Sequence, residues 1–270
     1  MERFTLTDKL VQESIKILSK INRNDKSLNL IIVGGMACQA YLKKPSLYRP
    51  INDIDTMTPI KISYSEFEDK LGKKIAEDLY KLGYASTFSK TIYGYEVKSN
   101  EEEDEFFIHI SKFSNAYLER HSKWKQREVE NAKEIEIMEI KGYPILIHRI
   151  EDVLVNKTRR IGRLKIKGYV QDEQLEEFEK FLEEDFESVG SANLTKKLED
   201  VKQIRASLIY ITKENFTNNT DKINSYKVKK DLYDIASLSR TIIEGKEPFD
   251  INYFRNALST IPSIEDIYPN

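Results

Sequence analysis

Asp53 and Asp55, one residue apart in "RPINDIDTM", are the side chains whose type and spacing most clearly indicate chemistry. A strand over residues 51–58 points both carboxylates from one face and Ile54 into the core, because alternate residues of a strand share a face. Two such carboxylates repel each other unless a cation lies between them. Divalent cations such as Mg²⁺ bind carboxylates together with substrate phosphates. The pair predicts metal-assisted phosphoryl or nucleotidyl transfer.

Gly34 and Gly35 follow a short apolar run, "LNLIIV" at residues 28–33, which is rich in β-branched residues. Such a run is typical of a central strand that is buried on both faces. A strand that ends in two glycines and leads into a helix lets the backbone come close to a ligand. The first turn of that helix offers unpaired N–H groups to an anion. The two glycines therefore predict a phosphate-binding turn.

The elements that must position these residues follow an α/β order up to residue 150. Apolar residues at helical spacing predict helices over residues 7–21 and 65–83, on either side of the two strands just described. Further strands are predicted at 90–99, 105–113, 134–140 and 143–149, of which the first two form an antiparallel pair. We expect an α/β (α+β) domain at residues 1–150, with a mixed β-sheet flanked by helices.

The pattern changes after residue 150, where polar-faced helical segments replace strand signals. These segments cover residues 150–163, 172–189, 192–211 and 229–243. We therefore expect a mainly helical domain at residues 151–270 that contributes to the active-site cleft.

Composition sets the outer limits on function. The chain has 270 residues, 40% of them hydrophobic, and its 43 Lys and Arg residues against 45 Asp and Glu residues give a formal charge of -2. This balance excludes overall basicity of the kind that marks a nucleic-acid binder. Cys38 is the single cysteine, which excludes an intramolecular disulfide and a Cys-rich zinc site. The polar N-terminus and the lack of a long apolar run favour a cytoplasmic protein with no membrane span.

The arrangement "VGGMACQAYL…RPINDID" resembles the signature of the DNA polymerase beta-like nucleotidyltransferase superfamily. In that superfamily a Gly-Gly or Gly-Ser turn holds the triphosphate, and a following Asp-x-Asp strand holds the metals. The resemblance implies that Gly34 and Gly35 bind a nucleotide and that Asp53 and Asp55 are catalytic metal ligands. It also implies a nucleotidyltransferase-type sheet, a nucleoside triphosphate as substrate and Mg²⁺ or Mn²⁺ as cofactor.

Two downstream segments, "PILIHRIEDVLVNKTRRIGR" and "KVKKDLYDIASL", are similar to motifs of the AbiEii-type nucleotidyltransferase toxins, including the MenT group. The resemblance implies that Lys157 and Asp231 are catalytic and that Lys157, Lys230 and Arg49 contact the nucleotide. A lysine ammonium neutralises phosphate charge. Asp231 and Asp234, three residues apart on a helix, share a face that can hold such a lysine or a metal-bound water.

The superfamily commonly carries a third carboxylate on a later strand, and the counterpart here is the centre of "FFIHI", His109. Strand periodicity puts Glu105, Phe107 and His109 on one face. His109 is a candidate neutral base, acting in the ordinary histidine range of about pH 6 to 7, or a metal ligand. Glu105 is the alternative third carboxylate, and a structural role for His109 is the other interpretation.

The resemblance implies transfer of a nucleoside monophosphate to an acceptor hydroxyl on tRNA, another RNA or a protein, by a toxin with an antitoxin partner. A local run of basic residues is compatible with RNA; it comprises Lys157, Arg159, Arg160, Arg163, Lys165 and Lys167. One alternative is a catalytically reduced nucleotide- or RNA-binding regulatory protein of the same fold. A small-molecule nucleotidyltransferase is another.

Overall fold

The computed structural model describes residues 4–59, 63–91, 94–101, 104–111, 124–166 and 220–259. Contacts within the chain divide it into two compact units. The sheet unit comprises Glu2–Ala40 and Pro50–Arg149, and the helical unit contains Tyr41–Arg49 and Ile150–Asn270. The helical unit therefore draws part of its packing from an early stretch of the sequence. The division into domains at residue 150 stays a prediction.

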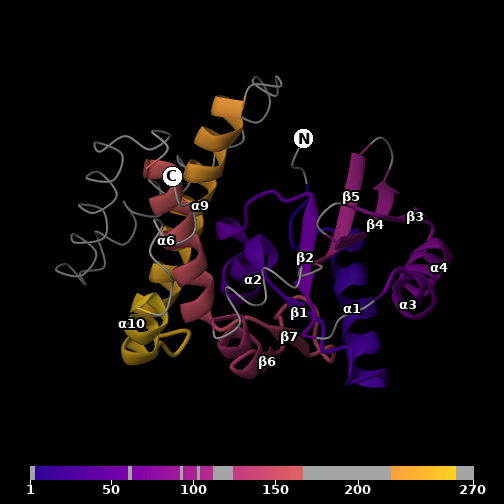
Figure 1. The fold of residues 1–270 in the computed structure, drawn as a ribbon, viewed down its shortest axis with the longest axis horizontal. Coiled ribbons are helices and arrows are strands. Elements are labelled where there is room, and N and C mark those ends of the chain that lie inside the picture. Colours follow the sequence, from indigo (N-terminus) through magenta and orange to yellow (C-terminus); the bar gives the residue numbers. More distant parts are fainter. Residues whose placement is uncertain are drawn as a thin grey trace. The chain divides into compact units, whose positions relative to one another are not determined.

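A seven-stranded mixed sheet forms the sheet unit, in the order β3-β4-β5-β2-β1-β7-β6 (Figure 1). The strands are β1 (Ile31–Ile32), β2 (Asp53–Met57), β3 (Ala85–Lys90), β4 (Gly94–Glu101), β5 (Asp104–Ser111), β6 (Lys133–Ile135) and β7 (Ile145–Ile147). The β2–β5 and β1–β7 pairs are parallel, and the other four neighbouring pairs are antiparallel. The α/β class and the mixed sheet with flanking helices are thus confirmed.

The centre of the sheet is built from the apolar run that the sequence assigned to a buried strand. Ile31 and Ile32 are fully buried in β1, between β2 on one side and β7 on the other. In β2 the exposure alternates as predicted: Ile54 is fully buried, whereas Asp53 and Asp55 are half-buried. The core face of β2 therefore anchors the strand and leaves the carboxylates on its other face.

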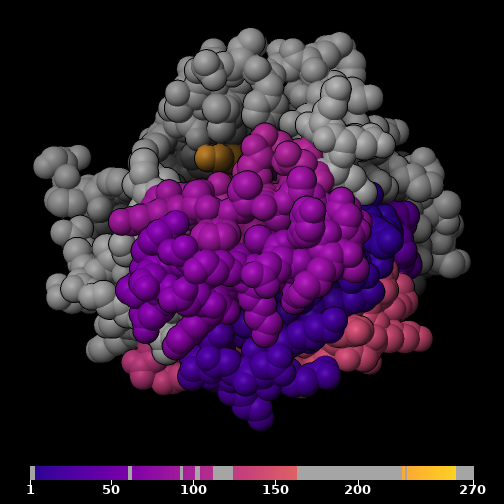
Figure 2. All heavy atoms as spheres, turned by 90° about the vertical axis from the view of Figure 1, so that its right-hand side faces the viewer, coloured from indigo at the N-terminus to yellow at the C-terminus, as the bar shows by residue number. Residues whose placement is uncertain are grey.

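Helices cover one side of this sheet. They are α1 (Lys9–Asn24), α3 (Tyr64–Phe67) and α4 (Lys73–Lys81), with a π-helical turn over Glu68–Gly72 between the last two. α1 and α4 contact each other as well as the sheet, α1 at β7 and α4 at β3 and β4. The face that carries α3 and α4 is turned toward the viewer in Figure 2. α1 and α4 bury the apolar stripe that their sequence periodicity predicts.

The helical unit contains α6 (Ile150–Ile166), α9 (Thr220–Ile243) and α10 (Ile251–Ser259), and α6 contacts both of the others. A 3₁₀ turn, Pro45–Leu47, lies in the early segment that joins this unit. The hydroxyl of Tyr233 on α9 donates to the carbonyl oxygen of Leu47 at 2.7 Å. This buried bond fixes residues 41–49 to a helix that comes much later in the sequence.

Several sequence expectations differ from the structure or lie beyond it. β3 was not predicted, because "ASTFSK" lacks an alternating apolar pattern and forms the edge of the sheet. The helices predicted at 172–189 and 192–211 lie outside the described residues. Among the described helices, none is long and apolar enough to cross a membrane.

Candidate metal site and buried ionic network

Two parallel strands bring the predicted metal ligands together in the sheet unit. In the β2–β5 ladder, Asp55 is paired with His109 and Asp53 with Phe107. The intervening Ile54 and Ile108 are buried on the opposite face. Since neighbouring residues at the same level of a sheet project from the same face, the register places His109 beside both aspartates.

The donor atoms of these three residues form a compact group. Nδ1 of His109 lies 3.3 Å from Oδ1 of Asp55 and 3.7 Å from Oδ2 of Asp53. One donor atom from each residue lies within 4.8 Å of the other two, which suits a shared cation. The set of two carboxylate oxygens and one imidazole nitrogen fits a divalent metal. All three side chains are partly exposed.

A fourth side chain, Glu96 on β4, contacts His109 from the other side of the ring. The antiparallel β4–β5 register pairs Glu96 with His109, and its Oε2 lies 3.0 Å from Nε2 of the ring. Sequence reasoning missed Glu96, because its place opposite His109 depends on the register of the β4–β5 hairpin. Glu105, the predicted alternative, is instead ion-paired with Lys98 and is absent from the metal-binding group among the described residues.

The carboxylates around His109 change its protonation. A hydrogen bond with Asp55 raises the pKa of His109 to about 9; burial opposes this, whereas the charges of Asp55 and Asp53 and the bond with Glu96 add to it. In the absence of a metal, these carboxylates therefore favour the protonated form of the ring. This pKa lies above the ordinary histidine range that the sequence suggested, and the role of His109 as a base stays a prediction.

The predicted glycine turn lies directly against this group. Gly34 begins α2 (Gly34–Tyr41) with a φ of +67°, a conformation that L side chains rarely adopt. A Cβ atom added to Gly34 would lie only 2.8 Å from Oδ2 of Asp55. The adjacent amide of Val33 donates to the carbonyl oxygen of Asp55 at 2.9 Å. Gly34 and Gly35 thus open a helix beside a metal-ligand candidate, where free N–H groups favour an anion.

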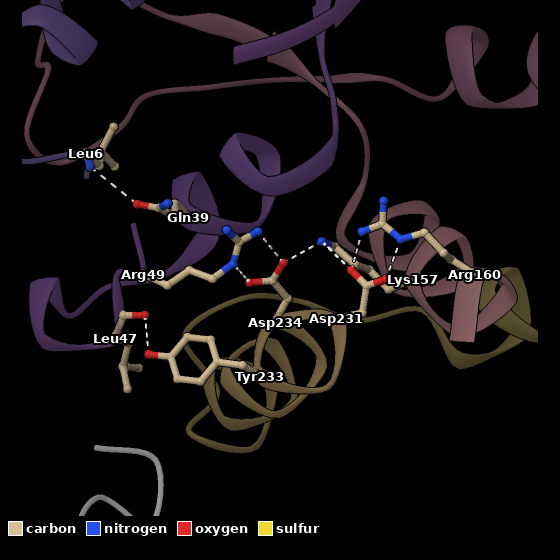
Figure 3. A network of polar contacts seen from close by, with 9 residues as sticks. All are labelled: Leu6, Gln39, Leu47, Arg49, Lys157, Arg160, Asp231, Tyr233 and Asp234. Carbon is tan, nitrogen blue, oxygen red and sulfur yellow. Dashed lines mark hydrogen bonds and ion pairs between the residues drawn. The ribbon is translucent and has the colours of Figure 1, made fainter. Parts of the chain in front are cut away.

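Three more of the predicted site residues, Arg49, Lys157 and Asp231, belong to a buried ionic network in the helical unit (Figure 3). Arg49 binds both carboxylate oxygens of Asp234, with Nε–Oδ1 and Nη2–Oδ2 distances of 2.6 and 2.8 Å. Lys157 on α6 donates to Asp231 at 3.0 Å and also to Asp234. Arg160, one turn further along α6, forms a two-pronged pair with Asp231. The shared face of α9 does hold a lysine, as its spacing indicated.

Burial and charge together hold this network in its ionised form. Lys157, Asp231 and Asp234 are each at most 4% exposed. Burial alone would raise the pKa of Asp234, but the charges of Arg49 and Lys157 hold it well below its usual range. Burial likewise opposes ionisation of Lys157, yet Asp234 and Asp231 raise the pKa of its ammonium group. These five side chains are three cations and two carboxylates, so together they carry a surplus of one positive charge.

The basic run on α6 is consequently less available to bind RNA than its sequence indicates. Lys157 is buried and Arg160 is paired with Asp231. The side chains of Arg163, Lys165 and Lys167 lie outside the described residues. Lys230, next to Asp231 on α9, is half-buried, and its role as a nucleotide ligand stays a prediction.

Comparisons with known proteins leave the function to be argued from the site. No family model matches the sequence, and no curated protein matches it. Matches among solved structures include the solution structure of the antibiotic-resistance factor ANT(2'')-Ia. The identity is 22% over 54% of this chain and 69% of that chain, with a TM-score of 0.32. At this TM-score the likeness carries no argument about the activity of this chain.

Proposed function

We propose that this protein is a metal-dependent nucleotidyltransferase, which moves a nucleoside monophosphate from a nucleoside triphosphate to an acceptor hydroxyl. The observation that carries the proposal is the contact between the glycine turn and the aspartate pair. A side chain at Gly34 would displace the carboxylate of Asp55, which lies against it. A helix N-terminus and a divalent-metal site are thus adjacent, and together they suit a triphosphate with its bound cation.

In this proposal Asp53, Asp55 and His109 hold the cation, Mg²⁺ or Mn²⁺, and Gly34 and Gly35 hold phosphate oxygens through their backbone. When bound, the cation neutralises charge on the phosphates and orients the α-phosphoryl group. The acceptor oxygen forms a bond to the α-phosphorus while the bond to the bridging oxygen breaks, and pyrophosphate leaves. The hydroxyl proton passes to a carboxylate oxygen of the site or to water.

The resemblance of the downstream motifs assigns further roles to the helical unit. Lys157, Lys230 and Arg49 contact the nucleotide phosphates, and Asp231 keeps Lys157 in place. The same resemblance supplies the acceptor, tRNA or another RNA or a protein, and the role of a toxin with an antitoxin partner, working in the cytoplasm.

A second candidate is a nucleotide- or RNA-binding regulatory protein that has lost catalysis. The presence of His109 where nucleotidyltransferases commonly carry a third carboxylate favours it. An imidazolium beside Asp53 and Asp55 neutralises part of their charge and weakens their hold on a cation. The two candidates share the nucleotide site and differ in turnover.

The test is label transfer from α-³²P nucleoside triphosphates to total RNA or to protein, with Mg²⁺ and with Mn²⁺. Wild-type protein is compared with the Asp53→Asn/Asp55→Asn double variant, which keeps side-chain size but removes the charge. We expect transfer by the wild type and none by the double variant. Nucleotide binding without transfer under every condition would identify the regulatory protein instead. Transfer that survives the double substitution would exclude this site.

A further inference from the structure

The carboxylate of Glu96 holds the far side of the His109 ring. Its Oε2 lies 3.0 Å from Nε2, whereas Nδ1 on the other side of the ring faces Asp55 and Asp53 at 3.3 and 3.7 Å. The ring therefore bridges two acidic sites that lie on different strands, β4 and β2. Glu96 is the least exposed of the side chains in this group, at 21%.

This arrangement determines which ring nitrogen is free to bind a cation. When Nε2–H donates to Glu96, the imidazole keeps its lone pair on Nδ1, directed at the two aspartates. A divalent cation that takes the place of the Nδ1 proton can bind this lone pair and the two carboxylates together. Histidine ligands in metal sites generally donate their other ring N–H to a carboxylate or a carbonyl group, which fixes the tautomer and raises the basicity of the ligand.

We propose that Glu96 is a positioning residue that presents Nδ1 of His109 as the third metal ligand beside Asp53 and Asp55, and that this nitrogen makes the site select transition metals such as Mn²⁺ over Mg²⁺. The inference rests on the metal site of the proposed function and specifies its cation. Mg²⁺ prefers an all-oxygen environment, whereas imidazole suits transition metals. A carboxylate in place of His109 would supply that oxygen environment.

The experiment measures Mn²⁺ and Mg²⁺ binding to chelator-treated protein by calorimetry, with no nucleotide present. We expect wild-type protein to bind Mn²⁺ at least about tenfold more tightly than Mg²⁺. His109→Asp should bring the two affinities together by strengthening Mg²⁺ binding, and His109→Asn, which lacks a ring nitrogen, should do so by weakening Mn²⁺ binding. An unchanged ratio of the two dissociation constants in both folded variants would overturn the inference.

Substitutions of Glu96 distinguish its hold on the His109 ring from the effect of its negative charge on cation binding. Glu96→Gln removes the charge but keeps an oxygen that can accept from Nε2–H, whereas Glu96→Ala removes both. We expect Glu96→Ala to weaken Mn²⁺ binding by about 10- to 100-fold and to lower the Mn²⁺/Mg²⁺ preference. Glu96→Gln should keep more of that preference. The matched control is Glu105→Gln, a carboxylate on β5 that pairs with Lys98 outside the metal group. Equal preferences in Glu96→Ala and Glu105→Gln would exclude a positioning role.

A spectroscopic measurement reports the ring directly. The chain has three histidines, so ¹⁵N-histidine spectra are simple, and comparison with His109→Ala assigns the signal. With Zn²⁺ as a diamagnetic probe, we expect metal-bound Nδ1 and protonated Nε2 in the wild type, and a mixture of tautomers in Glu96→Ala. Metal bound at Nε2, or no change on metal addition, would overturn the inference. If the wild type shows the expected metal preference and ring signals but no label transfer, only the proposed catalytic function is contradicted.

Discussion

Gly34 and Asp55 are in such close contact that a single added carbon on Gly34 would lie 2.8 Å from Oδ2 of the aspartate. The glycine also has a φ of +67°, which adds backbone strain for any other residue. Two separate consequences follow from a substitution here. One is a cost to stability, which every L residue would share, and the other is displacement of a proposed metal ligand.

Gly34→Ala should therefore lose metal binding as well as stability. The backbone strain costs about 1–2 kcal/mol in the free energy of unfolding, and the shift of Asp55 opens the metal site. Gly83→Ala is the matched control, because Gly83 has a φ of +94° but a Cβ atom added to it would meet nothing within 4 Å. We expect similar losses of stability in denaturant titrations and loss of Mn²⁺ binding in Gly34→Ala alone. Equal metal affinities in the two variants would contradict the assignment.

Asp53→Asn and Asp55→Asn should each make nucleotide binding independent of metal. The amide keeps the shape of the side chain but removes the charge that holds the cation. In calorimetric titrations of a nucleoside triphosphate, we expect the divalent ion to strengthen binding to the wild type by at least about tenfold and to have little effect on either variant. If the wild type binds the nucleotide equally well with and without the ion, the two aspartates have no metal role.

The candidate site residues that the sequence alone brings together are close to one another along the chain. Gly34 follows directly on an apolar run, and Asp53 and Asp55 share a face through strand periodicity alone. The contact of Glu96 with His109 depends on the register of a hairpin, which cannot be fixed without knowing the turn. Periodicity placed Glu105 on the face of His109, but the distance along the strand keeps it out of the group.

Long-range pairing limited the prediction of the helical unit in the same way. The face of α9 that carries Asp231 and Asp234 was predictable from their spacing, but the partner Arg49 comes 185 residues earlier. Nothing local to Arg49 indicates that it is buried against a carboxylate. The sequence suggested a nucleotide contact for this arginine, and the structure shows its buried bidentate pair with Asp234.

The charge balance of this network predicts unequal effects of two substitutions. Asp234→Asn breaks the buried pairs that Asp234 makes with Arg49 and Lys157, and breaking a buried pair costs about 3–5 kcal/mol. Lys157→Met keeps two balanced pairs, Arg49 with Asp234 and Arg160 with Asp231. We expect Lys157→Met to lower the free energy of unfolding by clearly less than Asp234→Asn does. Denaturant titrations measure both values, and the reverse order would show that Lys157 is the main stabilising cation.

His148 lies in the core of the sheet unit and is kept neutral by its surroundings. Its Nε2 lies 3.1 Å from Sδ of Met57, and the side chain is 3% exposed. Burial lowers the pKa of His148 to about 4, although the nearby charge of Glu128 opposes the shift. The folded protein therefore resists protonation at a position where the unfolded chain accepts a proton with a pKa near 6.5.

Stability should consequently fall as the pH drops from about 6.5 to about 4, because in this window the unfolded state binds a proton that the folded state excludes. Above the unfolded pKa of 6.5 both states are neutral and the effect of His148 on stability is constant. The shift corresponds to a loss of about 3 kcal/mol across the window. His148→Gln removes the titrating group while every carboxylate stays in place. Denaturant titrations of both proteins at several pH values should give a slope of stability against pH that is smaller in the variant by about 1.4 kcal/mol per pH unit. Equal slopes would mean that His148 takes up a proton as readily in the folded protein as in the unfolded chain.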